Sequence, residues 1–463
     1  MASIASIARP NVQFIKSLGA TDVASLVIVA VVTLRWVPRA ARAGWPSVTL
    51  WCLAAVLFFL PLTTVVRELS AHYPEQGGLY MWVHRAFGPR HSFFCAWCLW
   101  LNQVFYFPSY LLFALANFFM LAGGHSAGLA KSRMLSAGLV LIGLWALTLL
   151  NIRGFELAKW MQSLGTLAIW VPVGLLFAAA VLTLLHGTPG TPFHMRDLLP
   201  RNDAFAAFAL WSSMCFAFSG FEIAGFVGQE IRNPVRSVPL GLTLAGMAIL
   251  FLYFGGSSAI LLVMPANQID ERTGIGDAIQ TALHSPYAGN FVALLMAVAT
   301  IAATSSWMAG AARVPYAAAV EGRLPANLTK LHPRYRTPHV ALVAQCIFAS
   351  LTLLVSLFLN VDKKTTTVEE AYDVLVNLTI LIYFVPYIYL FLTPLVLVGR
   401  KMRWAVVAAT GTLTTVVSIV LLFVPPAGTN SVLTFETNMV LQSAAVFAVG
   451  LGVERFYARV RTQ

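Results

Sequence analysis

The chain has 463 residues, of which 59% are hydrophobic and only 10% are Asp, Glu, Lys or Arg. A soluble globular domain carries about a quarter charged residues, so this composition excludes an ordinary soluble protein and predicts one that lies in lipid. Five cysteines do not make a disulfide framework. The formal net charge of +12 does not by itself indicate nucleic-acid binding, because basic residues also mark the cytoplasmic side of a membrane protein.

Apolar runs long enough to cross the hydrocarbon layer, about 20 residues each, predict twelve transmembrane spans. The runs lack the alternation of a membrane barrel, and each span must satisfy its own backbone hydrogen bonds in lipid, so an all-α polytopic membrane protein is expected. The spans fall at 18–38, 47–66, 93–122, 134–152, 160–185, 204–228, 238–264, 288–312, 338–359, 371–398, 404–425 and 433–453.

The basic residues predict the orientation of these spans. With both termini in the cytoplasm, the inner segments carry twenty of the thirty Lys and Arg residues and the outer loops carry nine. Because basic residues concentrate on the cytoplasmic side, this orientation is preferred, and the positive charge would face anionic lipid headgroups. Membrane lipids are therefore expected partners and nucleic acid is not. Residues 1–463 are predicted to form a single membrane domain.

Two spans carry residues that would interrupt a helix. The first contains Thr33, Arg35 and Pro38, and the sixth contains the run Ser219–Glu222, in which Gly220 tolerates unwound backbone. Transporters with inverted repeats place their binding site on discontinuous helices at matching positions of the two halves. Breaks five spans apart therefore predict a five-plus-five repeat. Its halves would cover 18–185 and 204–398, followed by two additional helices within 404–453.

Four segments resemble signature elements of amino acid permeases in the amino acid–polyamine–organocation superfamily. They are Glu68-Leu69 with Tyr73-Pro74-Glu75-Gln76-Gly77-Gly78 and Tyr80, the Gly220-Phe221-Glu222 break, the loop with Glu230, Asn233-Pro234, Arg236 and Pro239, and the segment from Arg313 to Leu342. The resemblance implies a LeuT-like fold with discontinuous helices one and six, and alternating-access transport of amino acids or related compounds.

The chain also departs from this family in two places. Its permeases usually have a Gly-x-Gly break in span one, whose amides hold the substrate carboxylate, whereas Thr33, Leu34 and Arg35 stand at the matching positions. Some proton-coupled members have a lysine in span five where this chain has Ile169. Neither the carboxylate site nor the proton-coupling mechanism is therefore carried over unchanged.

The two charged residues at the breaks each have two interpretations. Glu222 would recognise a substrate amine or bind a transported proton, or it would hydrogen-bond helix backbone or a neighbouring tyrosine. Arg35 would bind a carboxylate with two hydrogen bonds, or pair with Glu222, or extend outward to join Arg39 and Arg42 at the outer headgroups. The predicted substrate-binding residues are Thr33, Arg35, Gln103, Tyr106, Ser219, Gly220, Phe221 and Glu222.

Hydroxyl groups and loop charges suggest further roles. Thr304 and Ser305 in span eight offer oxygen ligands for Na⁺, or they hydrogen-bond carbonyls one turn earlier, as membrane helix hydroxyls often do. No cofactor is predicted, and Na⁺ or H⁺ is the expected coupling ion. The predicted gating residues are Trp211, Glu230, Arg236 and Arg313. Trp211, before the sixth-span break, would gate it or pack in the core, and the other three would form cytoplasmic ion pairs or a solvated surface.

The favoured function is a secondary active transporter of small molecules, with neutral amino acids preferred because few acidic residues lie within the spans. The alternatives are a polyamine or cationic-amine transporter of the same superfamily and a membrane sensor on the same fold. The sequence contains no nucleophile elbow, P-loop or HExxH motif, so no enzymatic activity is predicted. The expected location is a bacterial inner membrane. The oligomeric state is not predicted.

Overall fold

A computed structural model describes residues 18–73, 78–121, 129, 131–153, 155–187, 189–199, 204–226, 231–312, 314–315, 319, 324–359, 366–426 and 429–462. In these ranges the regular structure is helical, apart from one isolated bridge between Leu18 and Ile231. Ten helices of the described chain are long and apolar enough to cross a membrane. The chain is therefore an integral, multi-pass membrane protein.

Each of these ten helices lies on one of the predicted spans. The first begins as α3, passes through a π-helical turn and ends as α4, and two shorter helices, α5 and α13, lie between spans. The bounds are α3 Pro46–Ala54, the π turn Ala55–Phe59, α4 Leu60–His72, α5 Gly78–Phe87, α6 Pro89–Leu121, α8 Arg133–Arg153, α9 Phe155–Leu185, α12 Pro234–Val263, α13 Gly274–Leu283, α14 Pro286–Ala311, α16 His339–Phe358, α17 Val368–Leu397, α18 Met402–Leu421 and α19 Val432–Thr462.

The first and sixth predicted spans contain shorter helices in pairs. The chain leaves the helical conformation between the members of each pair, at Val32–Arg35 and at Phe218–Glu222. At the second break Gly220 has a φ of 110°, which side chains rarely allow. The twelve-span, five-plus-five arrangement stays a prediction. The bounds are α1 Ala20–Val31, α2 Trp36–Ala41, α10 Ala204–Ala217 and α11 Ile223–Phe226.

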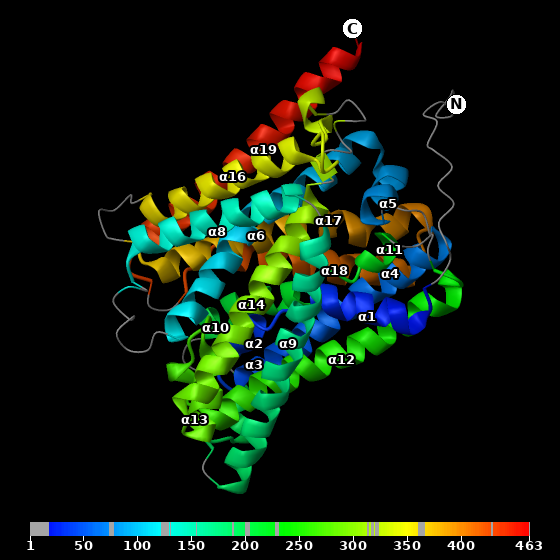
Figure 1. The fold of residues 1–463 in the computed structure, drawn as a ribbon. Coiled ribbons are helices and arrows are strands. Elements are labelled where there is room, and N and C mark those ends of the chain that lie inside the picture. Colours follow the sequence, from blue (N-terminus) through cyan, green and yellow to red (C-terminus); the bar gives the residue numbers. More distant parts are fainter. Residues whose placement is uncertain are drawn as a thin grey trace.

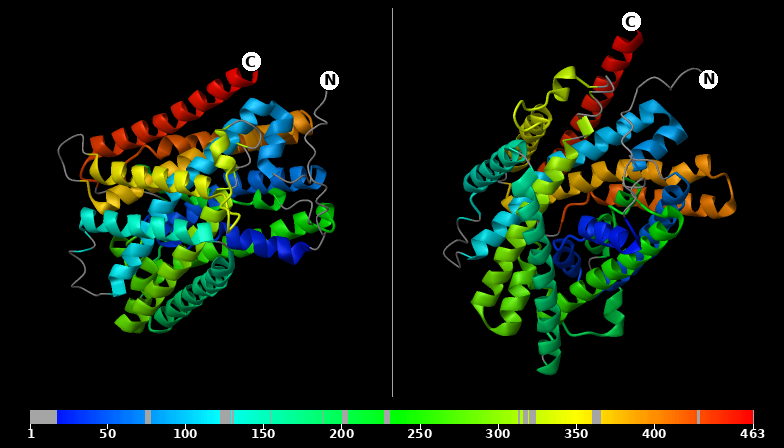
Figure 2. Two further views of the ribbon diagram at one scale, coloured as in Figure 1. Left: turned by 45° about the horizontal axis from the view of Figure 1, so that its top comes forward. Right: turned by 45° about the vertical axis from the view of Figure 1, so that its right-hand side comes forward.

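The long helices form a bundle around α6 and α17, which are buried over most of their length. Helix α6 packs against both α14 and α17, and α1 packs along α12. Helix α19 runs along the outside, and its C-terminal end projects from the bundle (Figures 1 and 2). Outer helices expose apolar side chains that suit contact with lipid, as Met134 and Ile142 do on α8. Both helix breaks are therefore enclosed by other helices.

Close contact between α1 and α12 depends on a glycine. A Cβ atom at Gly241 would lie 2.8 Å from the carbonyl oxygen of Ala20 and 2.8 Å from Val23. Small residues let membrane helices approach this closely. We expect Gly241→Val to destabilise the protein by about 1–3 kcal/mol through overpacking. The measurement is thermal unfolding of the purified protein, with Gly138→Val on α8 as control because a Cβ there meets no atom within 4 Å. Equal unfolding temperatures for the two variants would contradict this packing.

Candidate functional site

Arg35 lies in the break between α1 and α2, and its side chain is buried (1% exposed). Its Nη1 donates a hydrogen bond to the Ser109 hydroxyl of α6 at 3.1 Å. The guanidinium carbon lies 4.3 Å from the ring centre of Trp36 and 4.4 Å from that of Tyr110. The ring of Tyr106 is 5.2 Å away. These are cation–π distances, so aromatic faces enclose the cation.

Two nitrogen atoms of this guanidinium are unused. Nε and Nη2 of Arg35 have no hydrogen-bond partner in the described part of the chain. Arg35 also forms no ion pair with Glu222 or with any other carboxylate of the described residues. A buried cation without an anionic partner is costly. The Arg35 side chain therefore lacks an anionic partner among the described residues, and a ligand could supply one.

A cavity of about 50 Å³ adjoins Arg35, and we call it the Arg35 cavity. Thr33 and Arg35 line its polar part. The Thr33 hydroxyl accepts a hydrogen bond from Tyr110 at 3.0 Å, and the Thr33 amide donates one to the Tyr253 hydroxyl at 3.3 Å. Most of the remaining lining is apolar and comes from α1, the break, α6, α9 and α14: Val29, Ala30, Val32, Leu34, Phe113, Ile169, Met296, Ala299, Ala303 and Trp307.

A second cavity of about 50 Å³ adjoins the break between α10 and α11, and we call it the Ser219 cavity. Ser219 and Gly220 line it, together with Gln103 of α6. The Ser219 hydroxyl and the Gln103 Oε1 atom have no hydrogen-bond partner among the described residues. The two cavities share Thr33 and Tyr106, so they meet at the break of α1. Arg35 is the only charged side chain among the described residues that line them.

Glu222 lies beside the Ser219 cavity without lining it. Its carboxylate is buried (2% exposed) and accepts hydrogen bonds from Tyr383 at 2.5 Å and Tyr387 at 2.6 Å, both on α17. The Gly220 amide donates a third at 3.1 Å. Tyr383 lines the Ser219 cavity, so its hydroxyl connects Glu222 to that space. Glu222 thus ties the broken helix to α17.

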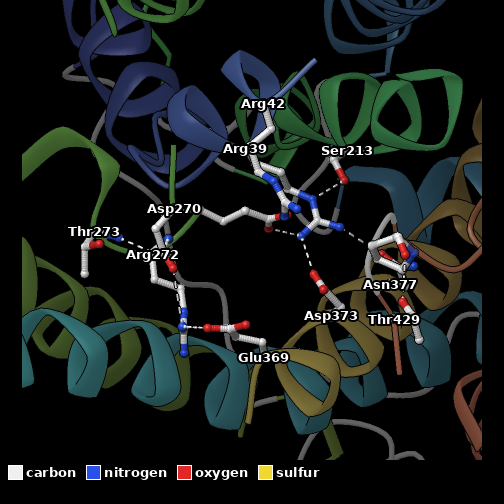
Figure 3. Close-up of polar contacts among 12 residues, drawn as sticks. Arg39, Arg42, Ser213, Asp270, Arg272, Thr273, Glu369, Asp373, Asn377 and Thr429 are labelled. Carbon is white, nitrogen blue, oxygen red and sulfur yellow. Dashed lines mark hydrogen bonds and ion pairs between the residues drawn. The ribbon is translucent and has the colours of Figure 1, made fainter. Parts of the chain in front are cut away.

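A buried ion-pair network lies at the other end of α2 (Figure 3). Arg39 is 3% exposed. Its Nη1 donates to Glu271 at 2.5 Å and to Asp373 at 3.0 Å. Its Nε donates to the Ser213 hydroxyl at 2.8 Å, and its Nη2 to the Asn377 side chain at 3.3 Å. We call these five residues the Arg39 network. The network joins α2 to α10, to α17 and to the segment before α13.

The Arg39 network borders a polar cavity of about 180 Å³. Arg42, also on the cavity wall, pairs with Glu271. Arg272 pairs with Asp270 at 3.4 Å and with Glu369 at 2.6 Å. Burial alone would raise the pKa of Asp270, but the Arg272 guanidinium and two backbone N–H groups outweigh it, so this pKa lies below its ordinary value. Arg42 and Arg272 are thus each paired with a carboxylate of this cavity wall, whereas the Glu370 carboxylate accepts hydrogen bonds from the backbone N–H groups of Thr367 and Asn430.

The structure places the predicted substrate-binding residues in three positions. Thr33, Arg35, Gln103, Tyr106, Ser219 and Gly220 line the two cavities. Glu222 lines neither cavity but is hydrogen-bonded to Tyr383, which lines the Ser219 cavity. Phe221 lines neither cavity, since it is fully buried and packs edge-on against Phe59 at 4.9 Å.

None of the described residues predicted for gating or for sodium lines either cavity. Trp211 is buried on α10, and Arg236 is exposed, with no ion pair to any described residue. Thr304 on α14 donates to the carbonyl of Thr300 at 2.8 Å, and Ser305 accepts from Asn151 at 3.0 Å. The Na⁺ role stays a prediction. Glu230 and Arg313 lie outside the described residues.

Sequence reasoning missed the Arg39 network. It assigned Arg39 to the outer headgroups, whereas the structure buries this side chain against Asp373. Two signals were present: Arg39 follows Arg35 by four residues, which places both on one helical face, and Asp373 lies inside an apolar span.

The family model for amino acid permeases matches residues 18–449. The chain belongs to the amino acid permease family. The permease is 25% identical to an uncharacterized transporter of Legionella pneumophila over 89% of its own chain and 90% of that protein. It is 24% identical to a glutamate/gamma-aminobutyrate antiporter of Lactococcus lactis, over 89% and 84% of the two chains. A probable agmatine/putrescine antiporter of Lactococcus lactis is 25% identical over 60% of the permease and 59% of that protein.

These relatives, like the family, are transporters, so the permease is a membrane transporter related to proteins that carry amino acids and amines.

Proposed function

We propose that the permease is a secondary active transporter of amino acids that works by alternating access and favours neutral amino acids. One observation carries this proposal: two adjoining cavities, with unpaired polar atoms at Arg35, Ser219 and Gln103, lie at the two helix breaks. Discontinuous helices are where transporters of this architecture bind substrate. The proposed arrangement has twelve spans, formed by a five-plus-five repeat and two further helices.

The Arg39 network supports a mechanism for closing one face. It ties α2 and α10, the helices that follow and precede the breaks, to α17. In the proposed orientation both termini are cytoplasmic, the membrane is a bacterial inner membrane, and this face is the outer one. Opening it would require Arg39 to exchange its partners, and such a change between two packings is typical of gating. Glu222 is the proposed site for H⁺ if H⁺ is the coupling ion, and Thr304 with Ser305 the site for Na⁺ if Na⁺ is.

The second candidate is a transporter of polyamines or cationic amines. The similarity to a probable agmatine/putrescine antiporter favours it. The lining of the two cavities disfavours it, because their only charged side chain among the described residues is the cation Arg35. A cationic substrate there would meet a like charge in a medium of low dielectric constant. A non-transporting sensor is the third candidate.

The test is uptake into proteoliposomes of radiolabelled neutral, acidic and basic amino acids and of polyamines, with and without Na⁺ and pH gradients. We expect saturable uptake of neutral amino acids, driven by one of the two gradients. Protein-free liposomes and the surface variant Arg90→Gln, far from both cavities, are the controls. Uptake of polyamines alone would establish the second candidate, and specific binding without flux of any compound would overturn transport in favour of a sensor.

A further inference from the structure

The Arg35 guanidinium presents one complete unused edge. Its Nη1 atom is occupied by Ser109, and the unpaired atoms are Nε and Nη2. Nε–H and one N–H of Nη2 point in the same direction along one side of the guanidinium plane. This pair of parallel donors matches the two oxygens of a carboxylate, which is the geometry of bidentate arginine–carboxylate recognition.

No described protein group serves this edge. The carboxylates of Glu271 and Asp373 are held by Arg39, and that of Glu222 is held by two tyrosines and a backbone amide. The aromatic faces of Trp36, Tyr106 and Tyr110 attract the cation but offer no in-plane acceptor to its N–H groups. Because a buried cation needs both an anion and hydrogen-bond acceptors, an anionic ligand fits the vacant edge.

The surroundings of this edge limit the ligand further. Arg35 lines a small cavity whose other walls are largely apolar, including Ile169 and Met296. The adjoining cavity presents two unpaired oxygen atoms, at Ser219 and at Gln103 Oε1, that can accept hydrogen bonds from an ammonium group. No described carboxylate lines either cavity. The polar groups therefore suit a carboxylate at one end of the ligand and an ammonium group, bound through neutral oxygens, at the other.

We propose that the Nε–Nη2 edge of Arg35 binds the carboxylate of the transported substrate, so that the permease selects α-amino acids over their amides and over amines. This deepens the proposed function and rests on it. Arg35 takes the place of the backbone amides that a glycine-rich break would supply. The substrate carboxylate compensates the buried guanidinium, so the occupied site is electrostatically more favourable than the empty one.

A carboxylate-binding role for Arg35 and a purely structural role lead to different results on replacement. If Arg35 served only to hold α2 against α6 through its aromatic contacts, its replacement would weaken uptake of every substrate to a similar degree. A carboxylate-binding arginine instead governs the difference between two ligands of nearly equal shape. A carboxamide has the shape of a carboxylate but lacks its charge and one of its two acceptor oxygens. The ratio of uptake of an amino acid to that of its amide is therefore the informative quantity.

The experiment measures kcat/KM for uptake of alanine, serine and leucine, and of their carboxamides and decarboxylated amines, into proteoliposomes. Wild type, Arg35→Lys, Arg35→Gln and the surface control Arg90→Gln are compared. We expect the wild type and the control to prefer the acids over the amides at least about 100-fold, because a site built for a polar group strongly rejects an analogue that lacks it. Arg35→Gln should reduce this ratio to near one. Arg35→Lys should retain charge but lose at least about tenfold in acid uptake, since it has no bidentate edge.

Each outcome decides between the two proposals. Acid-over-amide preference that persists unchanged in Arg35→Gln would overturn the role of Arg35 and leave amino acid transport standing. Proportional loss of acid and amide uptake in Arg35→Lys would also overturn it, in favour of a structural role. Arg35→Lys keeps the charge, so it still tests the proposal if Arg35→Gln does not fold, as judged by size-exclusion chromatography. A wild type that takes up none of the acids would overturn both proposals.

Discussion

Replacing Arg39 with methionine is expected to cost about 3–5 kcal/mol of stability, because removing one partner of a buried ion pair leaves uncompensated charge. Arg39 is the cation shared by Glu271 and Asp373, which would otherwise face each other in a buried environment. The same replacement at Arg42 should cost much less. The Arg42 side chain is 32% exposed and pairs only with Glu271 in the described part of the chain, so water screens it.

Thermal unfolding of the two purified variants in the same detergent checks this expectation. A further comparison isolates the charge: adding Asp373→Asn to Arg39→Met should recover part of the lost stability. Asp373 has no other ion-pair partner among the described residues, whereas Glu271 keeps Arg42. Similar unfolding temperatures for Arg39→Met and Arg42→Met would show that the network contributes little. The same replacement also removes the hydrogen bonds to Ser213 and Asn377, so these too would then contribute little.

Replacing Glu222 with leucine should both destabilise the permease and abolish uptake. The substitution removes the acceptor of the Tyr383 and Tyr387 hydroxyl groups. A buried polar group left without its partner costs about 1–3 kcal/mol. Gly220, whose amide also donates to Glu222, lies at the helix break that lines the Ser219 cavity, so the shape of this cavity depends on the same carboxylate.

Uptake and thermal unfolding of Glu222→Leu are measured beside two further variants. Glu222→Gln keeps one oxygen acceptor and should be destabilised less. Adding Tyr383→Phe to Glu222→Leu removes a hydroxyl whose only hydrogen-bond partner among the described residues is Glu222, so the double variant should be more stable than the sum of the single changes predicts. Strict additivity would show that the hydrogen bond is not a source of stability. Full uptake by Glu222→Leu would remove Glu222 from the transport cycle.

The sequence predicted the ten membrane-length helices of the described chain well because a membrane helix leaves a local signal, a run of about 20 apolar residues. The positions of the helix breaks were also locally encoded, by Gly220 with Glu222 in the sixth span and by Arg35 in the first. The predicted bounds of a span differ from the observed helix bounds where the span is not one continuous α-helix. The apolar run at 47–66 crosses a π-helical turn and continues to His72, which hydropathy does not register.

Contacts between distant segments could not be predicted in this way. Arg39 is separated by 232 positions from Glu271 and by 334 from Asp373, and no periodicity relates them. From the sequence alone, an arginine near the end of a span was therefore expected to contact lipid headgroups. A neighbouring tyrosine was one expected partner of Glu222, but which tyrosines reach it depends on how α17 packs against the break. The predicted cytoplasmic pairs involving Glu230 and Arg313 stay predictions.

Burial of the Arg39 network has a consequence for the surroundings in which the permease works. Mobile ions screen exposed charges at physiological ionic strength within about 8 Å, but they screen buried pairs much less. The exposed pair of Arg90 and Glu454 should weaken as the salt concentration rises, whereas the contacts of Arg39 should not. The free energy of the Arg39 contacts is thus set by the protein interior. In the proposed alternating-access cycle, the balance between the closed and open forms of this face should therefore change little with the salt concentration.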